Sequence, residues 1–582
     1  MSWLCCIHVR IAMQGVDCME FPLFEKMNLK FRSTPSESVS IELNKLTIII
    51  GPNNTGKSTL LGEIHSAISD ESYNPEASLV LDKCSPRILA TEEADALVSR
   101  FRFNRDYRHA DDGYYYYGIA KSENHSSHSH NRLVSSFSNE GSWERNNRIF
   151  THITRLMVKM LDGQSRLSIL NDAPLGDLRD ARSVYSLKNA FLSDSLDEIN
   201  SFVHEAFNAY LSVTSVTNAG SAVAFMTLDD PTAVGVNPKL MDSTTIGFFE
   251  NGDICSEAKT QSDGTKAFLG LLLELFFSSF DILLIDEPEA FLHPTLAYLL
   301  GTAVGKCSAK KQIICSTQSV DFLRGCLDSV KELNLLRLTR DGGGSVHVFE
   351  DYDLRKMQRV PLLRTASVMN GLFFNAVVVV EGDSDEAFYR EINYRLKDDP
   401  GHQSLNNALF VTSHGVDTEY KIISILRKAG IPAASIVDFD FLGKSTDVFG
   451  KLLVSANING TLFDSFKSQK QAVLSVVSVA GEDKSGVNKL NSSDAQAVLS
   501  LIEGLGSYGI FVVPNGSLES WLSCLDVQAP KDRWLGLMFD RLGDDPSSSS
   551  YVHPERNDVW EFLEKIASWV SDPDRKGMYW DD

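Results

Sequence analysis

Residues 46–59, with the sequence LTIIIGPNNTGKST, decide the fold of the first half of this chain. The run 46–50 is short, rich in β-branched residues and apolar on both faces, which predicts a buried strand of a parallel sheet. Apolar residues then recur at steps of three and four over 60–68, which predicts a helix. A strand, a glycine-containing loop and a helix in this order indicate an α/β domain.

The loop between this strand and helix fits the pattern G-x-x-x-x-G-K-[ST], which is typical of a phosphate-binding loop. Its glycines let the backbone N–H groups face phosphate, while Lys57 reaches the β- and γ-phosphate oxygens and Ser58 can hold Mg²⁺. We therefore predict a site for ATP and Mg²⁺. The residues expected to form it are Gly51, Asn53, Asn54, Gly56, Lys57, Ser58 and Thr59.

A second apolar strand, over 281–285, ends in two carboxylates and supports the same site. We expect Asp286 to bind Mg²⁺, directly or through water, and Glu287 to orient and activate the water that attacks ATP. An acidic pair at a strand end can also cap a helix. Two parts of a phosphate site on separate strands favour the nucleotide interpretation.

Residues 90–238, in the first half of the chain, are predicted to be a helical insertion and a candidate dimerisation region. Within them, residues 104–147 read as a long exposed loop.

The second half of the chain repeats the alternation of strands and helices. A glycine turn and a rise in charge mark a boundary near 345. Beyond it, runs typical of strands occur at 376–380, 408–411, 434–437 and 510–513. They predict a second α/β domain with a mostly parallel sheet.

Carboxylates follow two of these strands. Glu381 ends the run 376–380 and precedes a glycine turn, and Asp385 is expected one helical turn further on. Asp438 and Asp440 are expected on one face of a strand. Carboxylates that converge repel one another unless a cation neutralises them, so the pattern indicates a divalent metal site at the carboxyl edge of the sheet.

Charge and composition exclude other classes of protein. The chain has 582 residues and a formal charge of −22, which argues against tight nonspecific coating of nucleic acid. Nine scattered cysteines without a metal-binding spacing, and no secretory signal, favour a cytoplasmic protein with reduced thiols. The most apolar stretch contains Glu274 and Asp281, so we expect no membrane span. Residues 1–18 are irregular and are interpreted as an N-terminal extension.

With residues 261–266, 289–294 and 316–319, the first half resembles the ABC-type ATPase heads of the SMC and RecF kind. The resemblance implies a homodimer in which Ser262 and Gly264 of one copy face the γ-phosphate at Lys57 of the other. The family usually carries a histidine where this sequence has Gln318. This departure implies slow ATP hydrolysis or a regulatory role for ATP.

The second half, with 377–386 and 436–440, resembles the TOPRIM domain of topoisomerases, primases and OLD-family nucleases. An ABC-type ATPase over 19–345 followed by a TOPRIM domain with a helical tail over 346–582 is the order of the OLD family, which includes the Gabija antiphage nuclease. Residues 515–522 also resemble that family. The implied site holds two divalent ions, Mg²⁺ or Mn²⁺, about 3.5–4 Å apart. The residues implied as its ligands are Glu381, Asp385, Asp438, Asp440 and Glu519.

The leading hypothesis is therefore an ATP-regulated, metal-dependent DNA endonuclease of prokaryotic antiphage defence, acting as a homo-oligomer, with a partner defence protein left open. One alternative is an ATPase of the RecF or SMC type without nuclease activity. Another is a defence effector whose TOPRIM site cleaves RNA. Some polar residues stayed open between a functional and a structural or solvated role. They are Lys484 and Lys489 as phosphate contacts, His125, His128 and His130 as metal ligands, and His414.

Overall fold

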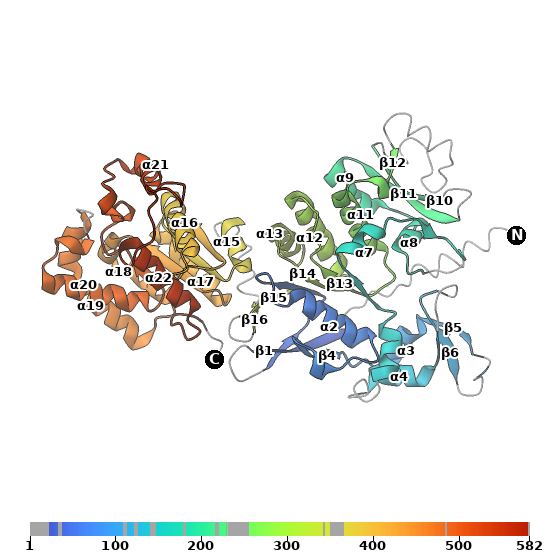
Figure 1. The fold of residues 1–582 in the computed structure, drawn as a ribbon. Helices are drawn as coiled ribbons and strands as arrows, with labels where there is room; N and C mark the ends of the chain where they lie inside the picture. Colours follow the sequence, from blue (N-terminus) through green and yellow to red (C-terminus); the bar gives the residue numbers. More distant parts are fainter. Residues whose placement is uncertain are drawn as a thin grey trace. The chain divides into compact units, whose positions relative to one another are not determined.

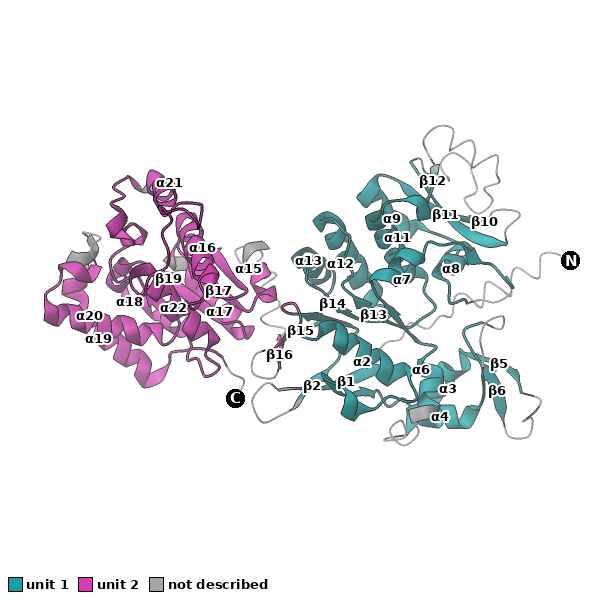
Figure 2. Cartoon of the chain, in the orientation of Figure 1, with its two compact units in different colours: residues 1–50, 54–338 teal, residues 51–53, 339–582 magenta. Residues whose placement is uncertain are grey.

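The computed structural model divides into two compact units, 1–50 with 54–338 and 51–53 with 339–582 (Figure 2). We predicted the boundary between domains at 345. The predicted N-terminal extension lies outside the described residues. The residues that the structure describes are 22–32, 38–106, 108, 113–120, 126–139, 147–178, 182–215, 220–228, 230, 255–340, 344–349, 366–482 and 486–579.

The first unit contains strands and helices throughout its length (Figure 1). Its strands are β1(Phe24–Arg32), β2(Ser38–Glu42), β3(Leu46–Ile50), β4(Leu81–Pro86), β5(Arg102–Arg105), β6(Tyr114–Tyr117), β7(Ser126–Ser129), β8(Val158–Leu161), β9(Ala173–Pro174), β10(Tyr210–Ser215), β11(Ser221–Thr227), β12(Cys255–Glu257), β13(Ile282–Asp286), β14(Gln312–Ser316) and β15(Asn334–Thr339). Its helices are α2(Lys57–Ser69), α3(Thr91–Ser99), α4(His130–Ser138), α6(Asn147–Thr154), α7(Gly163–Ser168), α8(Ser186–Leu192), α9(Asp197–Phe207), α11(Asp263–Phe277), α12(Pro294–Ser308) and α13(Val320–Ser329).

A parallel sheet organises the first unit. Strands β15, β3, β14, β13 and β8 follow one another in this order, each parallel to the next. Every residue of β3 and β14 is buried, and isoleucine is the commonest residue in both strands. The polar Gln312 and Ser316 at the ends of β14 form hydrogen bonds to Phe24 and Asp286. Helix α2 packs against β8, β13 and β14. The carboxyl ends of β3, β13 and β14 therefore meet at one edge of the sheet, where α2 begins.

The insertion contains strands as well as the helices that we expected. Residues 114–117, which we assigned to an exposed loop, form the central strand of the antiparallel sheet β5-β6-β7. Strand β8, also within the insertion, extends the central sheet beside β13. The insertion therefore contributes directly to the core of the first unit. The first unit also contains the antiparallel sheets β2-β1-β4 and β10-β11-β12.

The second unit is built around the parallel sheet β18-β17-β19-β20. Its strands are β16(Ser345–Val348), β17(Ala376–Val380), β18(Ala408–Thr412), β19(Ala433–Val437) and β20(Ile510–Val512). Its helices are α15(Ala366–Asn370), α16(Asp383–Asp398), α17(Val416–Lys428), α18(Thr446–Ser455), α19(Gly460–Glu482), α20(Ser492–Gly506), α21(Lys531–Leu542) and α22(Asp558–Ser571). The predicted parallel arrangement is confirmed. One core cluster of this unit joins sheet residues such as Val378 to Trp521 and Trp560, so the C-terminal helices belong to its fold.

No helix within the described residues is long and apolar enough to cross a membrane.

Candidate functional sites

The loop between β3 and α2 has the backbone of a phosphate-binding turn. Gly51, Asn54 and Gly56 have φ angles of 140°, 63° and 97°, a region that glycine and asparagine tolerate best. No side chain caps α2, and no acidic residue lies in its first turn. The first N–H groups of a helix have no partner within the helix, so this end of α2 favours an anion.

Side chains from β13 and β14 meet the start of α2. Ser58 Oγ donates a hydrogen bond of 3.0 Å to Asp286 Oδ1, and Ser316 Oγ donates to the same oxygen. Lys57 is buried, with only 5% of its surface exposed. Burial lowers the pKa of the Lys57 ammonium, and the nearby carboxylates of Glu287, Asp286 and Glu289 oppose that shift. The structure thus places the predicted Lys57, Ser58 and Asp286 in one site.

Glu287 is held by its backbone. Its φ of 48° is rare outside glycine, and its N–H donates to the Ser316 carbonyl at 3.1 Å. Gln318 Nε2 donates to Glu287 Oε1, and the Gln318 N–H donates to Glu289 Oε1 at 2.7 Å. The structure therefore brings Gln318 next to Glu287.

Arg166 belongs to this site, and our sequence analysis missed it. Its guanidinium is 1% exposed, and it donates to the Asp162 carbonyl at 2.9 Å and to the Glu287 carbonyl at 2.6 Å. Burial lowers the pKa of Arg166, while Glu289 and neighbouring carboxylates oppose the shift. The residue lies on α7, just after β8, in a region that we treated as an insertion. The one available signal was the short run 158–161, which forms a half-buried strand of the central sheet.

Ser262 and Gly264 lie at the start of α11. Ser262 is exposed and accepts from the Thr265 N–H at 3.4 Å, as an N-cap. A Cβ atom at Gly264 would lie 2.7 Å from the carbonyl oxygen of Phe291, so only glycine fits against that loop. The loop that contains Phe291 follows β13. Helix α7 also packs on α11 (Figure 1). The expected contact with Lys57 of a second copy stays a prediction.

Three strand ends of the second unit form the other candidate site. The Asp438 N–H, just after β19, donates to Glu381 Oε1, just after β17, at 3.4 Å. The Phe439 N–H donates to the Gly516 carbonyl at 2.8 Å, which brings in the turn after β20. The elements that we predicted from 377–386, 436–440 and 515–522 therefore meet at the carboxyl edge of one sheet.

The carboxylates of this site crowd Glu381. Burial raises the pKa of Glu381, and the negative charges of Asp440 and Asp385 raise it further. Asp385 lies in the first turn of α16, and its Oδ2 would be 3.2 Å from a Cβ atom at Gly382. The glycine at 382 thus lets the Asp385 carboxylate fold back towards the strand end.

The expected strand geometry of Asp438 and Asp440 is wrong. Strand β19 ends at Val437, and a 3₁₀ helix over Phe439–Gly443 follows it. At three residues per turn, Asp438 and Asp440 do not share a face. Phe439 is buried, while Asp440 pairs with Lys444 at 2.9 Å. Lys444 is a second residue of the site that we missed, because an isolated lysine carries no motif.

The carboxylates have the right chemistry for a divalent cation but are not arranged around one. Glu519 accepts a hydrogen bond of 2.6 Å from Ser517, and Asp440 is engaged by Lys444. Across the described ranges, no three His, Cys, Asp or Glu side chains lie close enough together to hold a metal ion. Oxygen ligands from carboxylates suit Mg²⁺ and Mn²⁺.

The structure describes four of the other candidate residues, His128, His130, His414 and Lys489. His130 contacts Tyr117 at 2.7 Å and Asp95 at 2.8 Å, while the rings of His128 and His152 are tilted by 31° with centroids 3.7 Å apart. His128 and His130 therefore face different partners, and His125 lies outside the described residues. Lys489 and His414 are exposed, and Lys484 lies outside the described residues.

Glu419 is a buried acid beneath the second site, on α17. It is 0% exposed, and its Oε1 accepts from Ser435 Oγ at 2.5 Å, while its Oε2 has no hydrogen-bond partner among the described residues. Burial raises the pKa of Glu419 well above the ordinary value, and Glu381, Asp385 and Asp438 act in the same direction. Burial and the neighbouring carboxylates therefore favour the protonated form of Glu419.

We expect Glu419→Gln to change how stability depends on pH. Between the ordinary glutamate pKa, about 4.3, and the raised pKa, the folded protein binds one proton more than the unfolded chain. The parent should therefore lose about 1.4 kcal/mol of stability per pH unit on this account as pH rises, and Glu419→Gln should not. Thermal unfolding from pH 5 to pH 8 measures the difference in stability between the parent and Glu419→Gln. Glu561→Gln, at an exposed side chain, is the control. A stability difference between the parent and Glu419→Gln that stays the same at every pH would contradict the expectation.

Two family models match the sequence. Residues 46–324 match AAA_21, "AAA domain, putative AbiEii toxin, Type IV TA system", and residues 372–440 match OLD-like_TOPRIM, "Overcoming lysogenization defect protein-like, TOPRIM domain". The chain joins a P-loop ATPase domain to an OLD-like TOPRIM domain. The first site above lies in the ATPase domain and the second in the TOPRIM domain. No curated protein matches the chain.

Solved structures similar to this chain include SMC heads. An SMC head bound to the C-winged helix domain of ScpA is 15% identical, with a TM-score of 0.33, over 58% of this chain and 100% of that chain. The SMC head domain from Thermotoga maritima is 13% identical, with a TM-score of 0.29, over 56% and 99%. An SMC head with an extended coiled coil, bound to the C-terminal domain of ScpA derived from Pyrococcus furiosus, is 14% identical, with a TM-score of 0.31, over 58% and 98%.

Proposed function

We propose that the protein is an ATP-regulated, divalent-metal-dependent DNA endonuclease of prokaryotic antiphage defence. The observation that carries the proposal is the meeting of Glu381, Asp438 and the Gly516 turn at the carboxyl edge of the TOPRIM sheet. Parallel α/β sheets bind their ligands at this edge. The same chain carries a phosphate-binding loop with its acidic partners, so nucleotide binding and phosphodiester hydrolysis can be linked.

In the ATPase domain, the N–H groups of the loop and Lys57 would bind the phosphates of ATP, and Ser58 and Asp286 would hold Mg²⁺. Glu287 would orient the attacking water. Its carbonyl is fixed by Arg166 and its carboxylate is contacted by Gln318. Gln318 is uncharged, which supports slow turnover. A homodimer that places Ser262 and Gly264 on the partner's ATP is part of the proposal.

In the TOPRIM domain, the residues that would hold the cation are Glu381, Asp385, Asp438, Asp440 and Glu519. A bound divalent cation would lower the pKa of a coordinated water and neutralise charge on the scissile phosphate. Burial and the nearby carboxylates raise the pKa of Glu381, which makes its carboxylate a better proton acceptor and supports a role as a general base. Lys444 lies beside Asp440 and, once that carboxylate turns to a cation, can contact a phosphate oxygen.

The test is a cleavage assay with the purified full chain. Supercoiled plasmid, linear DNA and tRNA are each incubated with Mg²⁺ or Mn²⁺, with and without ATP. We expect nicked or linearised plasmid that depends on the cation and responds to ATP. Cleavage of tRNA alone would replace the DNA assignment with an RNA one. A chain that binds ATP and cuts nothing would overturn the nuclease assignment.

One observation favours a second candidate, an ATPase of the RecF or SMC type without nuclease activity. Within the described part of the TOPRIM domain, the carboxylates engage Lys444 and Ser517 rather than surrounding a common point. This candidate predicts metal-independent nucleic-acid binding and no product in the same assay.

Arg166→Ala should slow ATP hydrolysis about tenfold with little change in KM. The side chain touches the backbone of Glu287 and not the phosphate loop, so it acts as a positioning residue. Arg166→Lys should not restore the rate, because an ammonium does not reproduce the fork that joins the Asp162 and Glu287 carbonyls. Steady-state ATPase kinetics separate the two parameters. The exposed Arg132→Ala, on α4, serves as control. A rise in KM with an unchanged kcat would contradict this role.

A further inference from the structure

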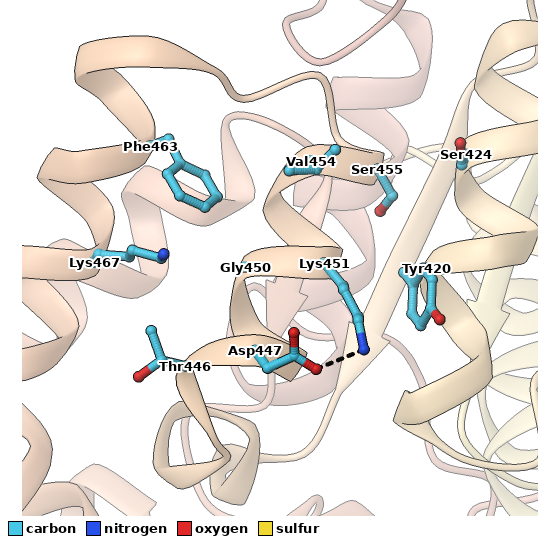
Figure 3. Close-up of a pocket in the computed structure, with 10 residues that line it drawn as sticks. All are labelled: Tyr420, Ser424, Thr446, Asp447, Gly450, Lys451, Val454, Ser455, Phe463 and Lys467. Carbon is cyan, nitrogen blue, oxygen red and sulfur yellow. Dashed lines mark hydrogen bonds and ion pairs between the residues drawn. The ribbon is translucent and has the colours of Figure 1, made fainter.

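Helices α17, α18 and α19 of the TOPRIM domain enclose a groove of about 340 Å³ (Figure 3). Tyr420 from α17 lies on one side of α18, and Phe463 from α19 lies on the other. A Cβ atom at Gly450 would lie 3.3 Å from Phe463 Cζ, so the glycine leaves room for this ring on α18. The groove is therefore bordered by two aromatic rings.

The groove lining on α18 begins six residues after Asp440 of the proposed nuclease site. Lys444, which pairs with Asp440, comes two residues before Thr446, the first residue of α18 and of the groove lining. The lining continues along one face of α18 to Val454. Eight residues of α-helix rise about 12 Å. The groove thus leads away from the carboxylates over a length that suits the nucleotides next to a scissile phosphate.

Cations accompany both rings. Lys451 Nζ lies 5.7 Å from the centroid of the Tyr420 ring, and Lys467 Nζ lies 4.3 Å from that of Phe463. Lys451 also pairs with Asp447 at 2.5 Å. The groove is lined by two lysines and one carboxylate, in a chain whose formal charge is −22. Aromatic rings with adjacent cations are the combination that holds single strands, because bases stack and phosphates pair with the lysines.

We propose that this groove binds unpaired nucleotides of the substrate strand next to the cleavage site. Bases stack on Tyr420 and Phe463, and phosphates contact Lys451 and Lys467. A duplex hides its base faces in the stack, so the groove selects a single-stranded or locally opened strand. The inference rests on the proposed function and adds the form of nucleic acid that the site accepts. DNA and RNA share this chemistry, and the experiment distinguishes them.

The experiment measures binding of the full chain in a Glu381→Gln background, which prevents cleavage, by fluorescence anisotropy with Mg²⁺. The probes are a fluorescein-labelled single-stranded DNA, the RNA of the same sequence and a DNA duplex. Tyr420→Ala and Phe463→Ala should each weaken single-strand binding about tenfold and leave duplex binding within about twofold. The conservative Tyr420→Phe should retain binding, which separates loss of the ring from loss of the fold. Tyr394→Ala, at an exposed tyrosine of α16, is the matched control.

The lysines have their own readout. Lys451→Ala and Lys467→Ala should each reduce the slope of log K against log salt by about 0.7, the value for one phosphate contact on a single strand. Lys565→Ala is the matched control, because Lys565 also pairs with a carboxylate four residues earlier on an exposed helix face. If the groove variants lose affinity for the single-stranded DNA probe, the substrate is DNA. If they lose affinity for the RNA probe, the substrate is RNA.

Unchanged single-strand affinity in all four groove variants would overturn the proposal, and so would an equal loss on duplex and single strand. A groove that serves a protein partner instead would give the first of these results. Failure of the nuclease assignment looks different. In that case the parent cuts nothing in the plasmid assay, while the groove variants still lose single-strand binding.

Discussion

Glu381→Gln should reduce nucleic-acid cleavage more than about a hundredfold while the TOPRIM domain stays folded. Substitution of residues that only support metal ligands commonly costs about 10–100-fold, so loss of a carboxylate at the strand end should cost at least as much. Burial and two neighbouring carboxylates raise the pKa of Glu381 in the cation-free protein. A neutral glutamine of the same shape relieves this repulsion, so the variant should be at least as stable as the parent without metal. Cleavage time courses and thermal unfolding with and without Mg²⁺ measure both effects.

Asp383→Asn is the matched control for this prediction. Asp383 is an exposed acid in the same first turn of α16 and takes no part in the hydrogen bond from Asp438. It should cut at the rate of the parent and show the same stabilisation by Mg²⁺. Equal cleavage by the parent and by Glu381→Gln would remove this edge of the sheet as the nuclease site.

Lys57→Ala should weaken ATP binding more than about a hundredfold. Lys57 is buried among Asp286, Glu287 and Glu289, and it is the cation that ATP phosphates would meet at the start of α2. Removing one member of a buried charge pair costs roughly 2–5 kcal/mol. Calorimetric titration measures the affinity, and the rise in thermal midpoint with added ATP should disappear.

Two further variants of the chain serve as comparisons for Lys57→Ala. Lys57→Met keeps most of the side-chain volume without the charge, so it should lose ATP binding with less disturbance of packing. Lys310→Ala, at a side chain with 68% exposure in the same domain, should bind ATP like the parent. Nucleotide control of cleavage should vanish in both Lys57 variants. An unchanged ATP affinity in both would show that the loop before α2 is not the nucleotide site.

Local patterns were sufficient for the strands that carry both sites. The runs 46–50 and 376–380 are strands with those bounds. A strand buried on both faces is mostly apolar, so its sequence indicates its position without knowledge of its neighbours. The same reasoning placed Lys57, Ser58 and Asp286 together, because parallel strands bring their carboxyl ends to one edge.

Sequence patterns did not predict the position of a residue when that position depends on contacts distant in the sequence or on a change of backbone conformation. The alternation around Asp438 and Asp440 resembled a strand, yet the backbone turns into a 3₁₀ helix once β19 ends. Glu419 lies on a helix whose sequence shows no motif, and only the packing of α17 against β19 buries it.

The sequence by itself determined the two α/β domains, the phosphate-binding loop and the acids at the ends of β13 and β17. These features depend on which residues are neighbours along the chain. Only the tertiary structure decided that Arg166 supports Glu287 across 121 positions and that Tyr420 and Phe463 border one groove. Such contacts form because burial of apolar surface brings distant segments together, and hydrogen bonds and charges then select among the side chains that meet.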